Sequence, residues 1–558
     1  MLALAAILIV LLRSVGLGNQ RTNHDQDGRL LVGVPTVGVS PNQVLIPWVR
    51  AIARSITQTA NNVAHGYTHF CKKHGLPFAI PSFGAGTIVI VPPHLFDAVL
   101  NRPESEIMAF PAQMRTLQPR YMMAADPELS LFRNPVQFDV VRKYMGHNGY
   151  GFFAAATAHE TDDAFRTYLG IDTENPRTIN IWQTAQRITS RTANRAFLGL
   201  PLCRNETLLQ ECASYAKMVY QGAVFIGALP ESLKPMLAPV FGLLSKSHRR
   251  KCMDILVPAV KGRLQQWSSR KGQEVMPNDA LQWIIEHSAR QQGAGNNKSS
   301  TSEGIDADLV AQRLLVLQIV STYTVALTLA PLIVNLYSSP RSPEFIAGLR
   351  EECERVAASS HDGSLSSREA VDKLFRVDSA VRESMRVSPF AVINPLRIVG
   401  GAGLTTHLPG GGGDDDMTKS GGKIFLPPGT TIGLPIQDVQ HDVDNYPDSP
   451  LEYDAFRFSG PFESPLAPTD NDNDHGDYAR DQQELASKAT KTFLPFSYGK
   501  HVCPGRWYAT QTLKQIVAYM VMHYDVEFVG DKSRPGSFLS ANLPPEKDEI
   551  RVVRRRTR

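Results

Sequence analysis

One cysteine has surroundings that suit chemistry, in the segment FSYGKHVCPGRWYA at residues 496–509. Cys503 comes just before a predicted helix, and a helix N-terminus favours a thiolate over a thiol. His501 offers a donor two residues away, and Phe496 supplies apolar cover. Gly499 permits a tight turn, and Gly505 keeps the start of the helix thin beside a flat ligand. A lone thiolate beside a flat apolar group suits a haem iron better than zinc, which needs several protein ligands.

An isolated cysteine is otherwise a buried, inert core residue. These 14 residues, however, match the haem-binding signature of the cytochrome P450 family, F-x-x-G-x-[HR]-x-C-x-G-x-x-x-A, at each fixed position. The resemblance implies that Cys503 is the axial thiolate ligand of haem b, which is iron protoporphyrin IX. It also implies that His501 reaches a haem propionate, and that Phe496, Gly499 and Gly505 belong to the cofactor-binding loop.

Two Glu-x-x-Arg pairs, Glu352/Arg355 and Glu383/Arg386, each place both side chains on one helix face. Either pair is otherwise an exposed ion pair that contributes little to stability. The segment around Glu383 resembles the E-x-x-R segment of the family, because an extended stretch with a proline follows it. Downstream, the segment YDAFRF resembles the family's meander, and this implies that Arg457 completes a buried structural triad with Glu383 and Arg386.

Further positions are assigned by the same resemblance. Arg397, in the segment PLRIV, matches a position that often binds a propionate, the alternative being an arginine on a surface strand. The W-x-x-x-R helix motif of the family is not found near its expected place. A propionate contact from that helix is therefore unassigned.

A long apolar segment from about residue 307 to 337 predicts the helix that faces the oxygen side of the haem in this family. The family usually carries [AG]-G-x-[DE]-T there, whereas this chain reads VSTYT at 320–324. Thr324 aligns with the family threonine, which implies a catalytic role in proton relay and a local widening of the helix. Tyr323 replaces the usual acid and Ser321 the usual glycine. The alternative for Thr324 is a hydroxyl that bonds to its own helix backbone.

The resemblance to fungal members also suggests an apolar substrate cleft. The candidate lining residues are Val320, Thr322 and Ala326 on the long helix, with Phe390, Ala391 and Val392 after the Glu383 helix. Apolar residues at these positions are equally compatible with core packing. The substrate implied is a lipophilic small molecule, such as a terpenoid of fungal secondary metabolism.

Composition limits the class of protein. The 558 residues are 42% hydrophobic and 20% charged with a net charge of +4, a globular balance that gives no nucleic-acid footprint. Six cysteines, none in a C-x-x-C pair, are too few for a disulfide scaffold and favour a reducing compartment.

The coarse pattern of elements predicts a mainly α fold with a small β region, in one large domain of the cytochrome P450 type. Apolar periodicity predicts helices at 179–197, 208–225, 280–285, 307–337, 344–358, 367–387 and 506–523. Residues 78–91 predict two strands joined by a glycine turn, 389–398 an extended stretch, and 423–434 a hairpin. Residues 291–304 predict a polar linker. Polar stretches near 400–422 and 459–491 predict inserted loops within the 21–558 haem domain.

The N-terminus carries an apolar run from Leu2 to Leu12, followed by Arg13 and Arg21. A full span needs about 20 apolar residues, so the run is short. A membrane anchor over residues 1–20 is the favoured interpretation, and the basic residues after it predict a catalytic domain in the cytosol, on the endoplasmic reticulum membrane. A cleaved signal peptide and an incomplete gene start are the alternatives.

The resemblance therefore implies a haem-thiolate monooxygenase that inserts one atom of O2 into its substrate. Electrons would come from NADPH through a separate flavin-containing reductase. Two other functions remain open from the sequence. One is a haem-thiolate isomerase or dehydratase acting on a peroxide, and the other is a haem protein that binds a ligand without turnover.

Overall fold

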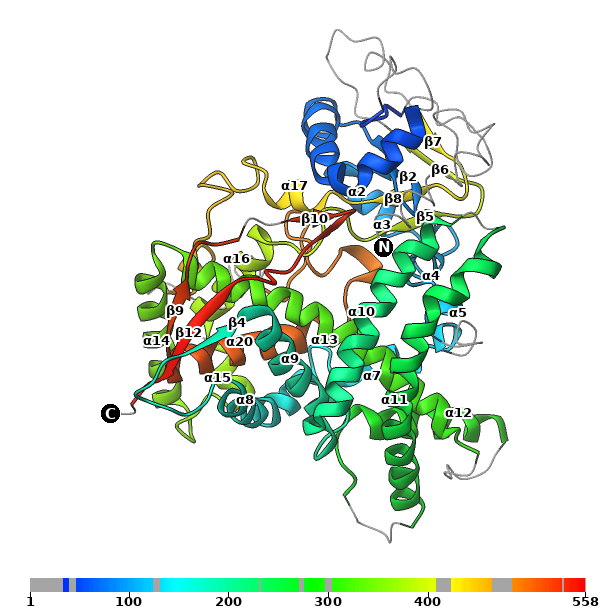
Figure 1. Ribbon diagram of the computed structural model, residues 1–558. Helices are drawn as coiled ribbons and strands as arrows, with labels where there is room; N and C mark the ends of the chain where they lie inside the picture. Colours follow the sequence, from blue (N-terminus) through cyan, green and yellow to red (C-terminus); the bar gives the residue numbers. More distant parts are fainter. Residues whose placement is uncertain are drawn as a thin grey trace, which may run out of the picture.

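The computed structural model describes residues 34–39, 47–123, 131–229, 232–269, 275–296, 304–407, 423–463, 484–533 and 536–556. Helices make up most of these residues, and short strands form small sheets (Figure 1). The predicted mainly helical fold with a small β region is confirmed. The predicted anchor over residues 1–20 lies outside the described residues, as do 408–422 and 464–483 of the two predicted loops.

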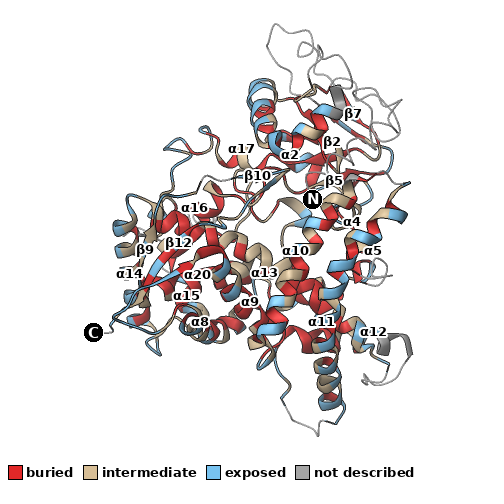
Figure 2. Cartoon of the chain, in the orientation of Figure 1, coloured by how far each residue is buried: buried red, intermediate tan, exposed pale blue. Residues whose placement is uncertain are grey.

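Helix α13 (Ala307–Ser338) runs through the middle of the molecule. It begins where Asp306 caps it, because Oδ1 of Asp306 accepts a hydrogen bond of 2.9 Å from the backbone N–H of Asp308. No residue from Leu309 to Ser338 is exposed (Figure 2). Among the described helices, α13 alone is long and apolar enough to cross a membrane, but 56% of its most apolar window is buried inside the protein. It is therefore packed as a core helix.

Two buried clusters of apolar side chains surround α13. Its first half packs, through residues such as Leu314, with α7 (Val136–Tyr144), α10 (Glu206–Ala228), α11 (Lys234–Ser269) and α12 (Ala280–Asn296). Its second half packs, through residues such as Leu329, with α8 (Ala154–Tyr168), α9 (Ile181–Phe197), α14 (Ser342–Ser359), α16 (Phe375–Val387) and α20 (Arg506–His523). The helix thus joins two halves of the helical region.

A five-stranded sheet forms the third part of the core. Its strand order is β1 (Phe78–Ser82), β2 (Gly86–Ile90), β8 (Thr431–Gly433), β5 (Arg397–Val399) and β3 (Ile107–Met108). The pair β2–β8 is parallel and the other pairs are antiparallel. A third buried cluster joins the sheet to η1 (Tyr67–Lys72), α3 (Phe96–Leu100) and α17 (Ile436–Gln440). The two strands predicted within 78–91 are confirmed as β1 and β2.

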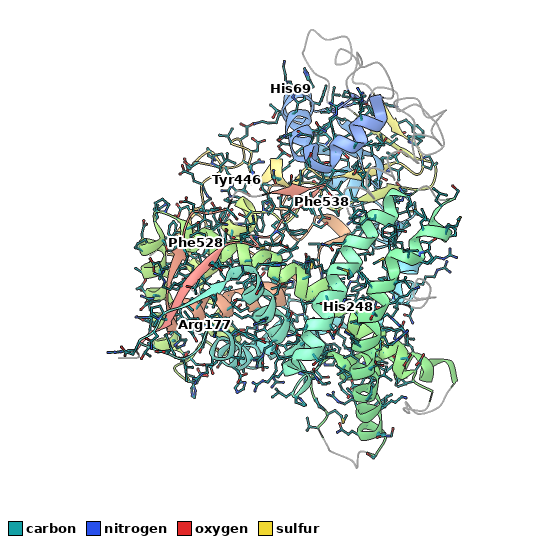
Figure 3. All side chains as sticks on the ribbon, viewed as in Figure 1. His69, Arg177, His248, Tyr446, Phe528 and Phe538 are labelled. Atoms are coloured by element: carbon teal, nitrogen blue, oxygen red, sulfur yellow. The ribbon has the colours of Figure 1, made fainter. Side chains whose placement is uncertain are left out.

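The remaining elements are short. A three-stranded sheet has the order β4 (Arg177–Asn180), β12 (Glu549–Arg554) and β9 (Tyr524–Val529). Two pairs are formed by β6 (Leu404–His407) with β7 (Lys423–Leu426), and by β10 (Ser537–Phe538) with β11 (Ala541–Asn542). Phe538, at the exposed end of β10, is labelled in Figure 3. The other described elements include α2 (Pro47–Gly66), α4 (Phe110–Leu117), α5 (Pro119–Met122), α15 (Arg368–Asp372) and η6 (Gly499–His501).

The hairpin predicted at 423–434 is wrong. Strand β7 pairs with β6, while β8 pairs with β2 and β5, so the turn sends the chain into a different sheet. Gly429 in that turn has φ +89°, a conformation that favours glycine. Because β6 starts at Leu404, the loop predicted near 400–422 also begins with a strand.

Two helix boundaries also differ from the prediction. The predicted helix at 367–387 is split into α15 and α16, and the buried Glu352 caps the second piece by accepting the backbone N–H groups of Arg376 and Val377 at 2.8 and 3.0 Å. The predicted linker at 291–304 begins inside α12, which continues to Asn296. Helix α11 was not predicted, and its apolar pattern is interrupted by Pro239 and Pro258.

Candidate metal centre

The loop before α20 places Cys503 at the N-terminus of that helix. The backbone N–H of Cys503 donates to the carbonyl of Phe496 at 2.9 Å, which closes the segment between them into a compact loop. Ser497 and Gly499 have φ values of +69° and +75°, so the loop turns sharply at both residues. A Cβ on Gly499 would lie 2.9 Å from the carbonyl oxygen of Leu100, and only glycine fits this contact. The predicted turn at Gly499 is therefore present.

Burial and the helix N-terminus shift the pKa of the Cys503 thiol in opposite directions. Burial raises its pKa, whereas the backbone N–H groups of Gly505 and Arg506 and the Arg506 guanidinium lower it. Of the six cysteines, Cys503 is the one that is not fully buried. No cluster of three or more His, Cys, Asp or Glu side chains in the described part of the chain is arranged to hold a metal ion. The arrangement offers one sulfur ligand to a metal, and a metal cation would stabilise its thiolate form.

A buried arginine lies on the sheet near this loop. Strand β5 holds Arg397, whose side chain is 4% exposed. Among the described residues its guanidinium makes one hydrogen bond, from Nη1 to the carbonyl of Leu396 at 2.9 Å. Burial lowers the pKa of Arg397 to about 10, and the Glu104 carboxylate opposes this shift. A buried cation with one neutral hydrogen bond is a good partner for an anion, and it excludes the alternative of a surface strand arginine.

His501 lies close to Arg397 and between two charged groups. Its Nε2 is 3.0 Å from Oε2 of Glu104. The other oxygen of Glu104 accepts the backbone N–H groups of Ala109 and Phe110, at the start of α4, at 2.8 and 2.9 Å. Burial lowers the pKa of His501, and the nearby Arg397 lowers it further. Glu104 therefore links the cysteine loop to α4, a contact that no sequence motif indicated.

A second arginine, on α7, was missed by the sequence analysis. The positive charge of Arg142 also lowers the pKa of His501, which places it in the same electrostatic cluster. Its Nη1 is 2.6 Å from Oδ1 of Asp139. The signal in the sequence was Phe138 four residues earlier, because an aromatic residue followed by arginine at that spacing resembles the W-x-x-x-R motif with phenylalanine in place of tryptophan.

Thr324 lies on α13, and its hydroxyl bonds to its own helix. Oγ1 of Thr324 donates to the carbonyl of Val320 at 2.8 Å, with the carbonyl of Ser321 at 3.1 Å. The helix is α-helical throughout, so the predicted widening at Thr324 is not seen. No hydrogen bond joins Thr324 to the cysteine loop within the described residues. Its catalytic role stays a prediction.

Tyr323 packs outward from α13 against two other helices. Its ring stacks on Tyr220 of α10 at 5.5 Å between centroids and meets the edge of Trp182 of α9 at 5.7 Å. Burial raises the pKa of Tyr323. This residue therefore fills an aromatic contact between helices where the family usually has an acid.

Some of the predicted cleft residues are packed in the core, and others remain candidates for lining the cleft. Ala326 and Val392 are fully buried in the second and third core clusters. Ala391 forms a bridge to Ala541, and the carbonyl of Phe390 accepts the N–H of Asn542 at 2.9 Å. The hydroxyl of Thr322 donates to the carbonyl of Gln318 at 2.7 Å. Ala326 and Val392 therefore pack in the core, and Val320, half-buried beside Thr324, stays a candidate.

The predicted triad is present on α16 and the loop that follows α17. Glu383 and Arg386 form two parallel hydrogen bonds of 2.7 and 2.8 Å, and Nε of Arg457 is 2.9 Å from Glu383. Arg386 also donates to the carbonyls of Gln440 and Pro450. The ring of Tyr446, labelled in Figure 3, covers the Arg386 guanidinium at 4.6 Å. Glu383 and Arg386 are fully buried and Arg457 is half-buried, and the three side chains hold α16 to the loop, as expected for a structural role.

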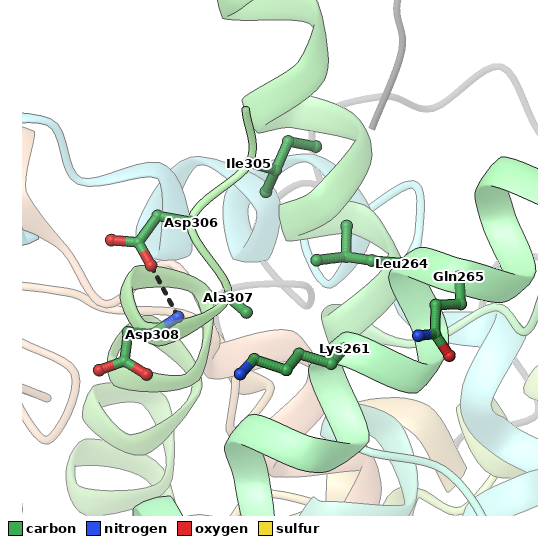
Figure 4. Close-up of a pocket in the computed structure, with 7 residues that line it drawn as sticks. All are labelled: Lys261, Leu264, Gln265, Ile305, Asp306, Ala307 and Asp308. Atoms are coloured by element: carbon green, nitrogen blue, oxygen red, sulfur yellow. Dashed lines mark hydrogen bonds between the residues drawn. The ribbon is translucent and has the colours of Figure 1, made fainter. Parts of the chain in front are cut away.

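An open pocket of about 460 Å³ lies elsewhere, between the end of α11 and the start of α13 (Figure 4). Lys261, Leu264 and Asp306 line it, and the carboxylate of Asp306 is engaged in capping α13. None of the predicted site residues lines this pocket. The chemistry of Cys503 therefore belongs to a different place.

The residues around Cys503 fit a haem. The loop supplies one thiol at a helix N-terminus, and Arg397 supplies a buried cation with little hydrogen bonding of its own. Arg142 adds positive charge nearby, and His501 adds an imidazole ring that can hydrogen-bond. One sulfur ligand with cationic side chains beside it matches a flat iron cofactor that carries two carboxylates.

Comparisons with known proteins agree with this chemistry. A family model described as cytochrome P450 matches residues 59–552. The chain is 31% identical to cytochrome P450 monooxygenase gloP of Glarea lozoyensis, over 91% of the chain and 89% of that protein. It is 33% identical to cytochrome P450 monooxygenase htyF of Aspergillus rugulosus, over 86% of the chain and 68% of that protein. It is 30% identical to cytochrome P450 monooxygenase okaG of Penicillium ochrochloron, over 91% of each chain.

Proposed function

The chain belongs to the cytochrome P450 family and is a haem-thiolate monooxygenase, and we propose that its substrate is a lipophilic small molecule of fungal secondary metabolism, such as a terpenoid. The observation that supports the haem-thiolate chemistry is the lone thiol of Cys503 at the N-terminus of α20, with the buried cation of Arg397 near the same loop, whereas the substrate class is inferred from the similarity to fungal monooxygenases. Haem b, when bound, supplies the activation of O2 that inserts one oxygen atom into the substrate.

Each residue of the loop has a defined part in holding the cofactor. Cys503 would hold the haem iron through its sulfur, and the N–H groups of Gly505 and Arg506 favour negative charge on that sulfur. Phe496 is partly buried, its backbone carbonyl accepts the N–H of Cys503, and its ring would give the site apolar cover. Gly499 allows the loop to approach the end of α3 closely.

Basic side chains would hold the two haem propionates. Arg397 offers a buried guanidinium, and His501 offers the ring nitrogen that does not face Glu104. Arg142 is a third candidate from α7. Charge-assisted hydrogen bonds of this kind each contribute about 1.5–3 kcal/mol to binding.

Thr324 is the candidate for proton transfer at its Oγ1 atom. In the structure this hydroxyl donates its proton to the carbonyl of Val320 and leaves its lone pairs to accept another. A threonine hydroxyl can thus accept a proton on one side and donate on the other. Serine would keep this capacity and alanine would remove it.

The partners follow from the family. Its members use O2, a small-molecule substrate and a redox partner, and here we expect NADPH electrons to arrive through a separate flavin-containing reductase. Residues 1–20 are proposed as an anchor in the endoplasmic reticulum membrane, with the catalytic domain in the cytosol, because of their apolar run and the basic residues after it.

The reduced, carbon monoxide-bound absorption spectrum tests the central assignment. The wild-type protein should show the strongly red-shifted band of a thiolate-ligated haem, and C503S should lose it. Cys71→Ser is the matched control, because Cys71 is buried and remote in sequence from the loop, and it should keep the band. The same band in C503S would rule out Cys503 as the ligand.

Whether product formation requires electrons distinguishes the monooxygenase from the two alternative functions. Product should form only when NADPH and a reductase are both supplied. Conversion of a peroxide substrate without them would indicate an isomerase or dehydratase. Haem and carbon monoxide binding without any turnover would indicate a ligand-binding protein.

A further inference from the structure

A pocket opens where α8, α14 and α20 meet the loop between α14 and α15 (Figure 1). Its volume is about 280 Å³. A cavity of about 150 Å³ holds benzene, so this pocket has room for two fused rings. Most of the lining is apolar, and the apolar lining residues include Ala158, Ala357, Leu365, Ala518 and Met522.

Hydrogen bonds hold the walls of this pocket in place without a ligand. Nε2 of Gln515 on α20 donates to the carbonyl of Leu365 at 3.2 Å and to a backbone carbonyl of α8 at 2.8 Å, which ties α20 to both neighbours. Asp362 accepts the hydroxyl protons of Ser364 and Ser366 at 2.8 and 2.9 Å, so the loop is folded on itself. Fixed walls lose little conformational freedom when a ligand binds. The pocket is therefore preformed, as small-molecule sites usually are.

One side chain of the lining has hydrogen-bonding groups that the protein does not use. His523, at the end of α20, is half-buried, and its ring packs on that of Tyr519 at 4.4 Å between centroids. Within the described residues, neither ring nitrogen of His523 has a hydrogen-bond partner, whereas the Tyr519 hydroxyl is bonded to Asp162. Burial lowers the pKa of His523, and the positive charge of Arg554 lowers it further. The ring is therefore neutral at pH 7, with one N–H donor and one acceptor nitrogen.

The pocket is separate from the candidate haem site. Cys503 precedes the N-terminus of α20, whereas the pocket is lined by residues from Gln515 to His523, in the second half of that helix. At about 1.5 Å per residue, these lie roughly 15–25 Å from the N-terminus of the helix. None of the predicted site residues lines the pocket.

We propose that this pocket is a second ligand site, separate from the haem, for a small apolar molecule that carries one hydroxyl group, such as a phenol or an alicyclic alcohol, and that His523 bonds this hydroxyl. The apolar walls take the hydrocarbon body of the ligand. A hydroxyl group both donates and accepts, which matches the two nitrogens of a neutral imidazole. An ionised ligand fits poorly, because no lining residue among those described carries the opposite charge at pH 7.

Equilibrium dialysis of the full-chain holoenzyme with two matched probes tests the site. 2-Naphthol and naphthalene share two fused rings and differ in the hydroxyl group. In both chambers 1-phenylimidazole, which ligates the haem iron, keeps the probes out of the haem cleft. The wild-type protein should bind a single 2-naphthol per chain, about fivefold more tightly than naphthalene, because one hydrogen bond contributes about 1 kcal/mol. The absorption spectrum of the haem should stay unchanged as the probes bind.

Variants of the chain assign the preference to His523 and the binding to this pocket. His523→Phe keeps an aromatic ring beside Tyr519 but removes both nitrogens, so it should bind the two probes equally. Ala158→Leu puts a larger side chain on the pocket wall and should weaken the binding of both probes. His287→Phe is the matched control, since His287 of α12 is also half-buried and does not line the pocket, and it should bind both probes as the wild type does. Each variant is compared at equal haem content and thermal midpoint, and if His523→Phe does not fold, Ala158→Leu carries the test.

Three results would overturn the proposal. The first is a wild-type protein that binds no 2-naphthol saturably or binds the two probes equally. The second is an unchanged preference in His523→Phe, and the third is wild-type affinity for both probes in Ala158→Leu. Each of these results would leave the monooxygenase assignment intact, because the carbon monoxide spectrum tests that assignment separately.

Discussion

Arg397 shows how a single side chain can be set up for a ligand rather than for folding. Its guanidinium is buried on β5 with one hydrogen bond to a neighbouring carbonyl, and burial lowers its pKa to about 10. A buried cation without an anion costs folding free energy. The position is therefore explained by an anion that binds after folding, as a haem propionate would.

Because Arg397 costs folding free energy and gains a partner only when haem binds, Arg397→Leu should affect haem binding and stability in opposite ways. Loss of the charge-assisted contact should release haem roughly tenfold faster, as about 1.4 kcal/mol of affinity is lost. The haem-free protein should unfold at the same temperature as the wild type or higher, since an unpaired buried charge is removed. Transfer of haem to a scavenging apoprotein measures the first effect and calorimetry the second.

Arg355→Leu is the matched control for Arg397, because Arg355 lies on the exposed face of α14 in a pair with Glu351. It should change neither quantity. A haem-free Arg397→Leu protein that unfolds well below the wild type would show that Arg397 supports the fold itself.

At the scale of elements, α17 carries a carboxyl group in an unfavourable place. Asp438 lies on this helix near Asp442, and its Oδ2 atom is buried with no hydrogen-bond partner among the described residues. Burial raises the pKa of Asp438 to about 7, and the negative charge of Asp442 adds to the shift. Cys71 and Tyr67 of η1 are near the same carboxyl group. Lys72 pairs with Asp442 and Asp444.

Asp438 should make stability depend on pH. Between about pH 4 and 7 the folded chain holds a proton on Asp438 that the unfolded chain has released, so the free energy of unfolding falls as pH rises through this window. D438N removes the ionisable group and should be more stable by on the order of 2 kcal/mol at pH 8, with little difference at pH 4. Thermal unfolding at a series of pH values measures this.

Asp444→Asn serves as the comparison, since Asp444 is exposed in its pair with Lys72. Its effect should not follow the same pH window. A wild-type stability that matches D438N at every pH would contradict the elevated pKa of Asp438.

In the molecule as a whole, the triad of Glu383, Arg386 and Arg457 holds α16 against the long irregular segment that follows α17. Glu383 and Arg386 are both fully buried, and they contact residues between Gln440 and Arg457. This segment leads toward the cysteine loop, because the backbone N–H of Leu494 donates to the side chain of Gln440. The triad thus supports the position of the metal centre from a distance.

Glu383→Gln should destabilise the protein by about 3–5 kcal/mol, because it leaves Arg386 buried without its anion. The fraction of protein that retains haem should fall along with the thermal midpoint. Glu344→Gln is the control, since Glu344 forms an exposed pair with Arg341 on α14, and it should have little effect. An unchanged midpoint in Glu383→Gln would mean that the triad is dispensable.

The chemistry of the site and the positions of the main helices could be predicted from the sequence. The spacing of Phe496, Gly499, His501, Cys503 and Gly505 indicated a haem-thiolate loop, and each of these residues lies in the loop that the structure shows. Helix α20 spans the predicted residues and α13 begins and ends within one residue of them, since apolar residues recur along most of the length of both. Local patterns of this kind depend on neighbours in the chain, which a sequence displays directly.

The contacts between residues that are distant in the sequence could not be predicted and are seen only in the folded protein. Glu104 contacts His501, almost 400 positions away in the sequence. Arg115 of α4 donates a hydrogen bond to Thr431 of β8, which is also distant in the sequence. The sequence of β7 and β8 predicted a hairpin, but β7 pairs with β6 and β8 pairs with β2, which is distant in the sequence. Such contacts carry no local period or motif, since they depend on the packing of whole elements, and for that reason only the folded chain reveals them.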